Sequence, residues 1–189
     1  SYLGRLIYDY QGKYLLTASL RRDGNTRFAP GNQFGYFPAV SVGWKLNEDL
    51  LQQVSQIDLL KLRFGWGATG NSRIGSWRFD DFLSAPNVFA PVFGEPAYEA
   101  PGQYIYYSFA NPFIQWESAN MTNIGIDANL FRNKIQLLAE YYIKNNNDML
   151  VQRSISGIFG RSMDGSFPFV NVGQVKNSGF EFSGSWRET

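Results

Sequence analysis

The chain has 189 residues, enough for one ordinary domain with a sizeable core, and a net charge of +1. Charged residues make up only 17% of it and aromatic residues another 17%, whereas a typical soluble domain is about 25% charged. Cysteine and histidine are absent, which excludes disulfides, thiolate or histidine zinc sites, and Ser-His-Asp or Cys-His catalysis within the chain. The sequence has no basic run that would follow a nucleic acid, and no apolar run near the ~20 residues of a membrane helix.

Seven segments alternate between two kinds of side chain with the period of two that predicts β-strands. In chain order they are residues 3–10, 14–21, 36–46, 60–67, 121–130, 135–144 and 176–186. Every charged side chain in these segments except Lys176 falls on one face of its strand, and the opposite face carries no other charge. We therefore predict an all-β, antiparallel protein. The alternation fits both a soluble β-sandwich and a barrel in lipid.

The connections between these segments alternate in length. Residues 23–35, 70–118 and 149–175 are long connections, and 11–13, 47–58 and 131–133 are shorter. All the long loops then lie at one end of the sheet, which is typical of outer-membrane barrels with long extracellular loops. Five aromatic side chains near strand ends on the uncharged face are candidates for a membrane girdle. They are Tyr10, Tyr14, Trp44, Trp66 and Trp186.

Residues 47–54 allow two interpretations. Asn47 can cap a short amphipathic helix that begins at Glu48, because acidic residues fill its first turn. The alternative is an irregular turn with an apolar anchor.

Residues 65–70 spell G-x-G-x-x-G, the pattern of dinucleotide-binding loops. That pattern requires a buried parallel strand before it and a helix directly after it. Here Lys61 and Arg63 alternate along the preceding strand, and no helical period follows. The sequence therefore predicts no cofactor. Gly65 and Gly67 instead fall on the polar face, where glycine lets a bulky partner approach or the strand bend.

Several stretches together resemble the SusC/RagA-type TonB-dependent outer-membrane transporters. They are RRDGNTRF (21–28), YFPAVSVGWKL (36–46), LKLRFGWGATGN (60–71), NPFIQWE (111–117), NIGIDANLF (123–131), EYYIKNNNDML (140–150) and VKNSGFEFSGSW (175–186). Phe113-Ile114 and Ser178 depart from the usual family residues. The resemblance implies that residues 1–189 form about seven strands of a transmembrane barrel of roughly 22 strands. It also implies that the plug domain, the TonB-contacting box and the final strand lie outside this sequence.

The resemblance further implies a location in the outer membrane of a Gram-negative cell. The expected function is import of a bulky nutrient, usually an oligosaccharide and sometimes a peptide, energised by TonB through the missing plug. The expected partners are a SusD-like surface lipoprotein and outer-membrane lipid. No catalysis, metal or cofactor is expected.

Two groups of residues are candidates for contact with cargo. Aromatic rings in the loop of residues 77–109 can stack on sugars, or can pack the loop against its neighbours. They include Trp77, Phe79, Tyr98, Tyr104, Tyr106 and Tyr107. Charged side chains on the polar face can line a lumen and bind cargo or plug, or can pair across strands. They are Arg5, Asp9, Lys61, Arg63, Asp127, Glu140, Lys144 and Glu181.

Two alternatives remain open from the sequence. One is a soluble carbohydrate-binding β-sandwich. The other is a small passive pore, closed by an additional strand near 104–109.

Overall fold

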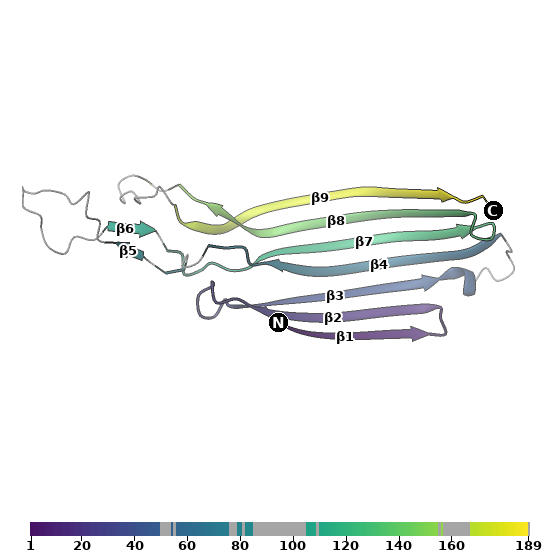
Figure 1. Ribbon diagram of the computed structural model, residues 1–189, viewed down its shortest axis with the longest axis horizontal. Coiled ribbons are helices and arrows are strands. Elements are labelled where there is room, and N and C mark those ends of the chain that lie inside the picture. Colours follow the sequence, from purple (N-terminus) through teal and green to yellow (C-terminus); the bar gives the residue numbers. More distant parts are fainter. Residues whose placement is uncertain are drawn as a thin grey trace, which may run out of the picture.

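The computed structural model describes residues 1–49, 54, 56–75, 79–80, 82–84, 105–108, 110–154, 156 and 167–188. Most of them form one seven-stranded antiparallel sheet in the order β1-β2-β3-β4-β7-β8-β9 (Figure 1). Its strands are β1 (Tyr2–Tyr10), β2 (Tyr14–Gly24), β3 (Phe34–Lys45), β4 (Ile57–Asn71), β7 (Glu117–Leu130), β8 (Ile135–Gln152) and β9 (Phe169–Trp186). A 3-10 turn, η1 (Leu46–Glu48), follows β3. A separate two-stranded sheet pairs β5 (Phe82–Ser84) with β6 (Ile105–Ser108).

All seven predicted strands are present, and several are longer than predicted. The β8 strand continues to Gln152 and β9 begins at Phe169, so residues 145–152 pair with residues 169–176. The sequence pattern missed this extension because Asn145, Asn146, Asn147 and Asp148 have turn chemistry and low strand propensity. Asn145 and Asn146 pair with β9 and Asn147 pairs with β7, whereas Asp148 lies at an irregularity of the ladder with a positive φ of 56°.

The described part of the sheet is a single layer with two exposed edges, β1 and β9. Large apolar side chains are exposed on its uncharged face, among them Ile124 (56%), Phe180 (71%) and Phe182 (78%). A β-sandwich would cover such a face with a second sheet, and none of the described residues does so. The sandwich alternative is therefore wrong for this part of the chain. The strand predicted near 104–109 exists as β6 but pairs with β5, so it does not close a small barrel.

The strands run side by side along the long axis of the molecule, with β1 and β9 at opposite edges (Figure 1). The connections β2–β3, β4–β7 and β8–β9 lie at one end, which we call the long-loop end, and the others lie at the short-turn end. The β1–β2 hairpin turns through Gln11 and Gly12, both with positive φ (54° and 67°). Two positive φ angles match the right-handed twist of the flanking strands.

The turn after β3 differs from the predicted helix. Lys45, rather than Asn47, occupies the position before the 3-10 turn. The Asn47 amide instead donates to the Asp58 carbonyl (3.1 Å) and accepts from the Leu60 N–H (3.2 Å), which ties the turn to β4. Residues 50–53 of the predicted helix lie outside the described residues. Within the described part, no helix has the length and apolar character needed to cross a membrane.

A small apolar core lies at the long-loop end, and we call it the long-loop cluster. Phe28, Ile74 and Ile114 are its buried members, with Trp116, Leu150 and Phe169 packed around them. The Trp116 ring stacks on Phe28 at 5.0 Å and meets the edge of the buried Phe37 ring at 5.6 Å. The cluster joins five segments of the chain, and two of the family-like stretches, RRDGNTRF and NPFIQWE, supply Phe28 and Trp116.

Candidate functional site

All eight charged side chains predicted for the lumen share one face of the sheet, here called the polar face. One register row runs across all seven strands through Asp9, Leu15, Gly43, Arg63, Gly125, Glu140 and Glu181. A second row joins Arg5 to Lys144 through Ser19, Ala39, Gly67 and Met121. Lys61 and Asp127 face each other in a third row. Because paired residues point to the same side of a sheet, these charges line one surface.

Arg63 organises an ion-pair network at the middle of the polar face. Its Nε donates to Asp127 Oδ1 (3.0 Å) and lies 2.9 Å from Oδ2 of the same carboxylate. Its Nη2 lies 3.0 Å from Glu140 Oε2, and the Asn123 amide donates to Glu140 Oε1 (3.2 Å). Three of the eight predicted residues are thus paired with one another across β4, β7 and β8.

The other five predicted residues form fewer ion pairs and hydrogen bonds with the described residues. Asp9 accepts a hydrogen bond from the Gly12 N–H (2.7 Å) in the first hairpin. Within the described residues, Arg5, Lys61, Lys144 and Glu181 form no ion pair. Glu181 directly faces Glu140, and Lys61 directly faces Lys45. Like charges in direct register repel each other.

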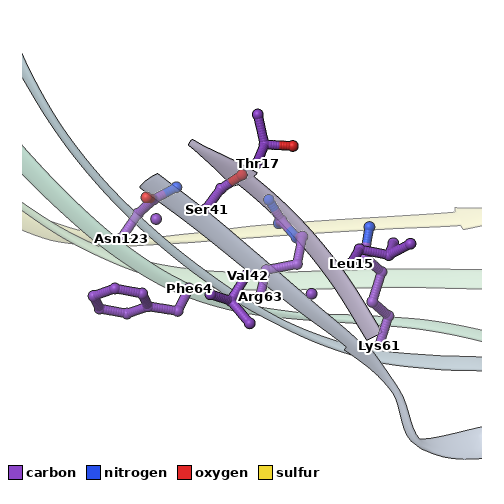
Figure 2. Close-up of a pocket in the computed structure, with 10 residues that line it drawn as sticks. Leu15, Thr17, Ser41, Val42, Lys61, Arg63, Phe64 and Asn123 are labelled. Atoms are coloured by element: carbon purple, nitrogen blue, oxygen red, sulfur yellow. The ribbon is translucent and has the colours of Figure 1, made fainter. Parts of the chain in front are cut away.

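A hollow of about 340 Å³ opens on the polar face beside Arg63 and Lys61. Its polar lining comes from three neighbouring positions of one register row, Thr17, Ser41 and Asn123, with Gly65 between the last two. Figure 2 shows Thr17, Ser41 and Asn123 gathered on one side, whereas the Phe64 ring projects away from them. These three uncharged residues were not among the predicted lumen residues, which were all charged. They alternate along their strands in phase with the charged residues of the polar face, and that pattern could have identified them.

Glycines on the polar face have neighbours from this chain over them. A Cβ added at Gly65 would overlap the Asn123 side-chain amide, and one at Gly67 would lie 3.1 Å from the Ala39 Cβ. A Cβ at Gly70 would overlap the Phe37 ring. The predicted close approach at Gly65 therefore comes from a cross-strand side chain of the same sheet. No separate partner is needed to explain it.

The predicted girdle residues lie on the opposite face. Tyr10, Tyr14 and Trp44 occupy one register row, with ring centroids 6.3 Å and then 6.1 Å apart. Trp186 is 78% exposed near the short-turn end, and Trp66 is 37% exposed farther along the sheet. Two charged residues also fall on this face. Lys176 of β9 pairs with Asn145, and Arg22 of the extended β2 pairs with Tyr36, its guanidinium 4.0 Å from the Phe34 ring centroid.

A polar contact anchors this aromatic row at the short-turn end. The Tyr14 hydroxyl donates to Asp49 Oδ2 (2.6 Å), and Lys13 Nζ lies 3.4 Å from Asp49 Oδ1. The hydrogen bond from Tyr14 holds the pKa of the Asp49 carboxyl below its ordinary value, against the opposing effect of desolvation, and Lys13 adds to the lowering. Hydrogen bonds to the ionised form favour that form.

The predicted loop aromatics are largely beyond what the structure describes. Trp77, Tyr98 and Tyr104 lie outside the described residues. Tyr106 and Tyr107 belong to β6, whose backbone alone is described, and Phe79 is half-buried in a turn. Their role in ligand binding stays a prediction. Over the described residues, no group of three or more His, Cys, Asp or Glu side chains is placed to hold a metal ion.

Comparison with known proteins gives the same family over nearly the whole chain. The family model described as TonB dependent receptor-like, beta-barrel matches residues 2–188. The TonB-dependent receptor P39 of Formosa agariphila is 35% identical over 97% of this chain, which covers 16% of that protein. SusC of Bacteroides thetaiotaomicron, also a TonB-dependent receptor, is 33% identical over 97% of this chain, which covers 18% of it.

Comparison with solved structures gives the same family as comparison of the sequences. The RagAB peptide importer in its closed-closed state superposes with a TM-score of 0.80 and 25% identity, covering 96% of this chain and 19% of that one. The siderophore receptor PirA of Pseudomonas aeruginosa shares the fold alone, at 13% identity and a TM-score of 0.58. This chain thus spans less than a fifth of the curated relatives it matches. It belongs to the TonB-dependent receptor β-barrel family of the outer membrane, with relatives of the SusC and RagA type.

Proposed function

We propose that this chain forms part of the barrel wall of a TonB-dependent importer. The importer carries a bulky nutrient, most simply an oligosaccharide, across the outer membrane. The observation that carries the proposal is the opposition of the two faces. One face exposes apolar side chains across all seven strands, as lipid requires, and the other carries the charged residues of β1, β4, β7, β8 and β9, as a polar lumen requires.

The proposed importer works with two partners. A SusD-like lipoprotein on the cell surface captures the cargo, and TonB supplies energy through a plug domain that fills the lumen. The predicted loop aromatics would contact cargo or lipoprotein at the long-loop end. The sequence similarity to SusC supports these roles for the lipoprotein and for TonB. Import by this route makes and breaks no bond in the cargo.

A second candidate cargo is a peptide. It is favoured by one observation, the structural similarity to the RagAB peptide importer at a TM-score of 0.80. Oligosaccharides and peptides differ in charge and in the rings they present, so the same loop residues would serve them differently.

The proposal is tested in the cell that carries the complete receptor. Deleting the receptor should abolish growth on one class of oligosaccharide as sole carbon source, and the intact gene should restore it. A TonB deletion should give the same loss, and an affinity-tagged receptor should co-purify with a surface lipoprotein. If growth were lost on peptides alone, the cargo would be a peptide instead of an oligosaccharide. Unimpaired growth on both would overturn it.

A further inference from the structure

The hollow beside Lys61 carries positive charge that the described part of the chain does not neutralise. Arg63 is already matched by two carboxylates, Asp127 and Glu140. Lys61 faces Asp127 on one side, but both oxygens of that carboxylate are within 3.0 Å of Arg63 Nε. On its other side Lys61 faces Lys45, and neither lysine forms an ion pair with any described residue.

The register places Lys61 directly opposite Lys45. Residues in direct cross-strand register have Cβ atoms about 5 Å apart, and like charges in that position destabilise the pair. The Lys61 side chain lies over Gly43 of β3, where an added Cβ would come within 2.9 Å of its Cε. Glycine at position 43 thus leaves room for the Lys61 stem to lie along the hollow, which both residues line. An anion bound there would offset the unpaired charge of Lys61.

The rest of the lining suits an oxyanion. Thr17 and Ser41 face each other across β2 and β3 and supply two hydroxyl groups. Asn123 of β7 also lines the hollow, but its amide N–H donates to Glu140 Oε1 and its Oδ1 lies over Gly65. Hydroxyl donors next to an ammonium group form charge-assisted hydrogen bonds with carboxylate or sulfate oxygens. Carboxylate side chains are absent from the lining, and the hollow is lined by Arg63 and Lys61 as its charged groups.

From this arrangement we infer that the Thr17–Ser41–Lys61 hollow is an oxyanion site on the polar face, for a carboxylate or sulfate group. The inference rests on the proposed function only in placing this face in an import lumen. The oxyanion has two sources. It is a group on passing cargo, or it is an Asp or Glu side chain from another part of the receptor inside the lumen. The chemistry is the same in both cases.

The test uses the complete receptor in detergent, with its lysines converted to ¹³C-dimethyl-lysines and the Lys61 and Lys134 signals assigned through Lys61→Arg and Lys134→Arg variants. Lys134 is the control, because it lies exposed in the β7–β8 turn. The probes are sodium acetate and sodium sulfate. With a free site, the Lys61 signal moves and saturates at an anion concentration about tenfold lower than any response of Lys134, since one unpaired ammonium group and two hydroxyl groups converge on one anion. A Thr17→Val/Ser41→Ala variant should weaken that response.

An internal carboxylate gives a different result. The Lys61 signal then does not respond to either anion, and Lys61→Met lowers the temperature at which the receptor unfolds, whereas Lys134→Met does not. That outcome supports the site with the second source. A weak, linear response equal to that of Lys134 would overturn the inference, and so would an unresponsive signal combined with a neutral Lys61→Met variant. Because the titration measures anion binding without transport, its failure leaves the import proposal standing, and failed import leaves the titration informative.

Discussion

Ile74 and Ile114 lie forty residues apart in the chain and are packed into one cluster, 7% and 0% exposed respectively. They flank the long connection that contains β5 and β6, so both ends of that connection are held at the same point. Side-chain hydrogen bonds reinforce the anchorage, from Arg27 to the Ile74 carbonyl (3.2 Å) and from Asn32 to the Ile114 carbonyl (3.2 Å). The Trp116 indole returns a hydrogen bond to the Asn32 carbonyl (3.1 Å).

Phe28→Ala tests this anchorage. Phe28 is fully buried and stacked on Trp116, so its truncation should cost about 3–5 kcal/mol of local stability. Limited proteolysis of the complete receptor should then cut within residues 76–109 much faster, while the heat-modifiable barrel band persists. Phe113→Ala is the matched control, because that ring is 82% exposed. Equal protease sensitivity of the two variants would contradict the anchoring role.

Gly70→Ala tests the packing of Phe37. The new Cβ would overlap the Phe37 ring, which is 7% exposed, and we expect a loss of about 1–3 kcal/mol from forced displacement. Adding Phe37→Leu should restore much of the loss. Gly4→Ala serves as the control, since nothing lies within 4 Å of its added Cβ. Thermal unfolding of the complete receptor measures all three, and a Gly70→Ala variant as stable as Gly4→Ala would refute the contact.

Arg63→Met tests the ion-pair network. Removing the guanidinium leaves Asp127 and Glu140 without their cation, and the expected loss is about 1–3 kcal/mol, discounted toward the lower figure because Arg63 is 28% exposed. The triple variant that also carries Asp127→Asn and Glu140→Gln should recover stability. Arg5→Met, on the same face but without an ion pair among the described residues, should change little. A triple variant less stable than Arg63→Met alone would show that the carboxylates do not need the arginine.

The hydrogen bond between Tyr14 and Asp49 at the short-turn end should be sensitive to acid. Its pKa in the folded protein lies below the ordinary value of 3.8, so its contribution is fully present above that value and is lost as pH falls through the folded pKa. Tyr14→Phe removes the hydrogen bond that contributes most to the lowering and should move the pKa of Asp49 upward. A ¹³C-carboxyl titration of Asp49 measures the change. An unchanged titration in Tyr14→Phe would assign the lowering to another group.

Ile124→Lys tests which face meets lipid. Ile124 is 56% exposed on the uncharged face, and a lysine at the membrane midplane costs about 2–4 kcal/mol, falling toward zero near the interfaces. Ser183→Lys is the control, since Ser183 shares the polar face with Glu181 in β9. The amount of heat-modifiable receptor in the outer membrane reports folding. A greater loss for Ser183→Lys than for Ile124→Lys would reverse the assignment of the two faces.

The sequence by itself determined the strands and their two faces. A period of two places Arg63, Asp127 and Glu181 on one side and Phe64, Ile124 and Phe180 on the other, because side chains alternate along any strand whatever it pairs with. Loop lengths determined which end carries the long connections, because antiparallel strands alternate in direction.

Tertiary structure decided what depends on neighbours far apart in the chain. Register selected Asp127 and Glu140 as the partners of Arg63 and left Lys61 facing Lys45, and a shift of one residue would have changed every such pair. It also extended β8 beyond Asn145, since pairing with β7 and β9 outweighs weak local propensity. The long-loop cluster was invisible in the sequence, because Phe28, Ile74 and Ile114 follow no common period and become one core only when their three segments meet.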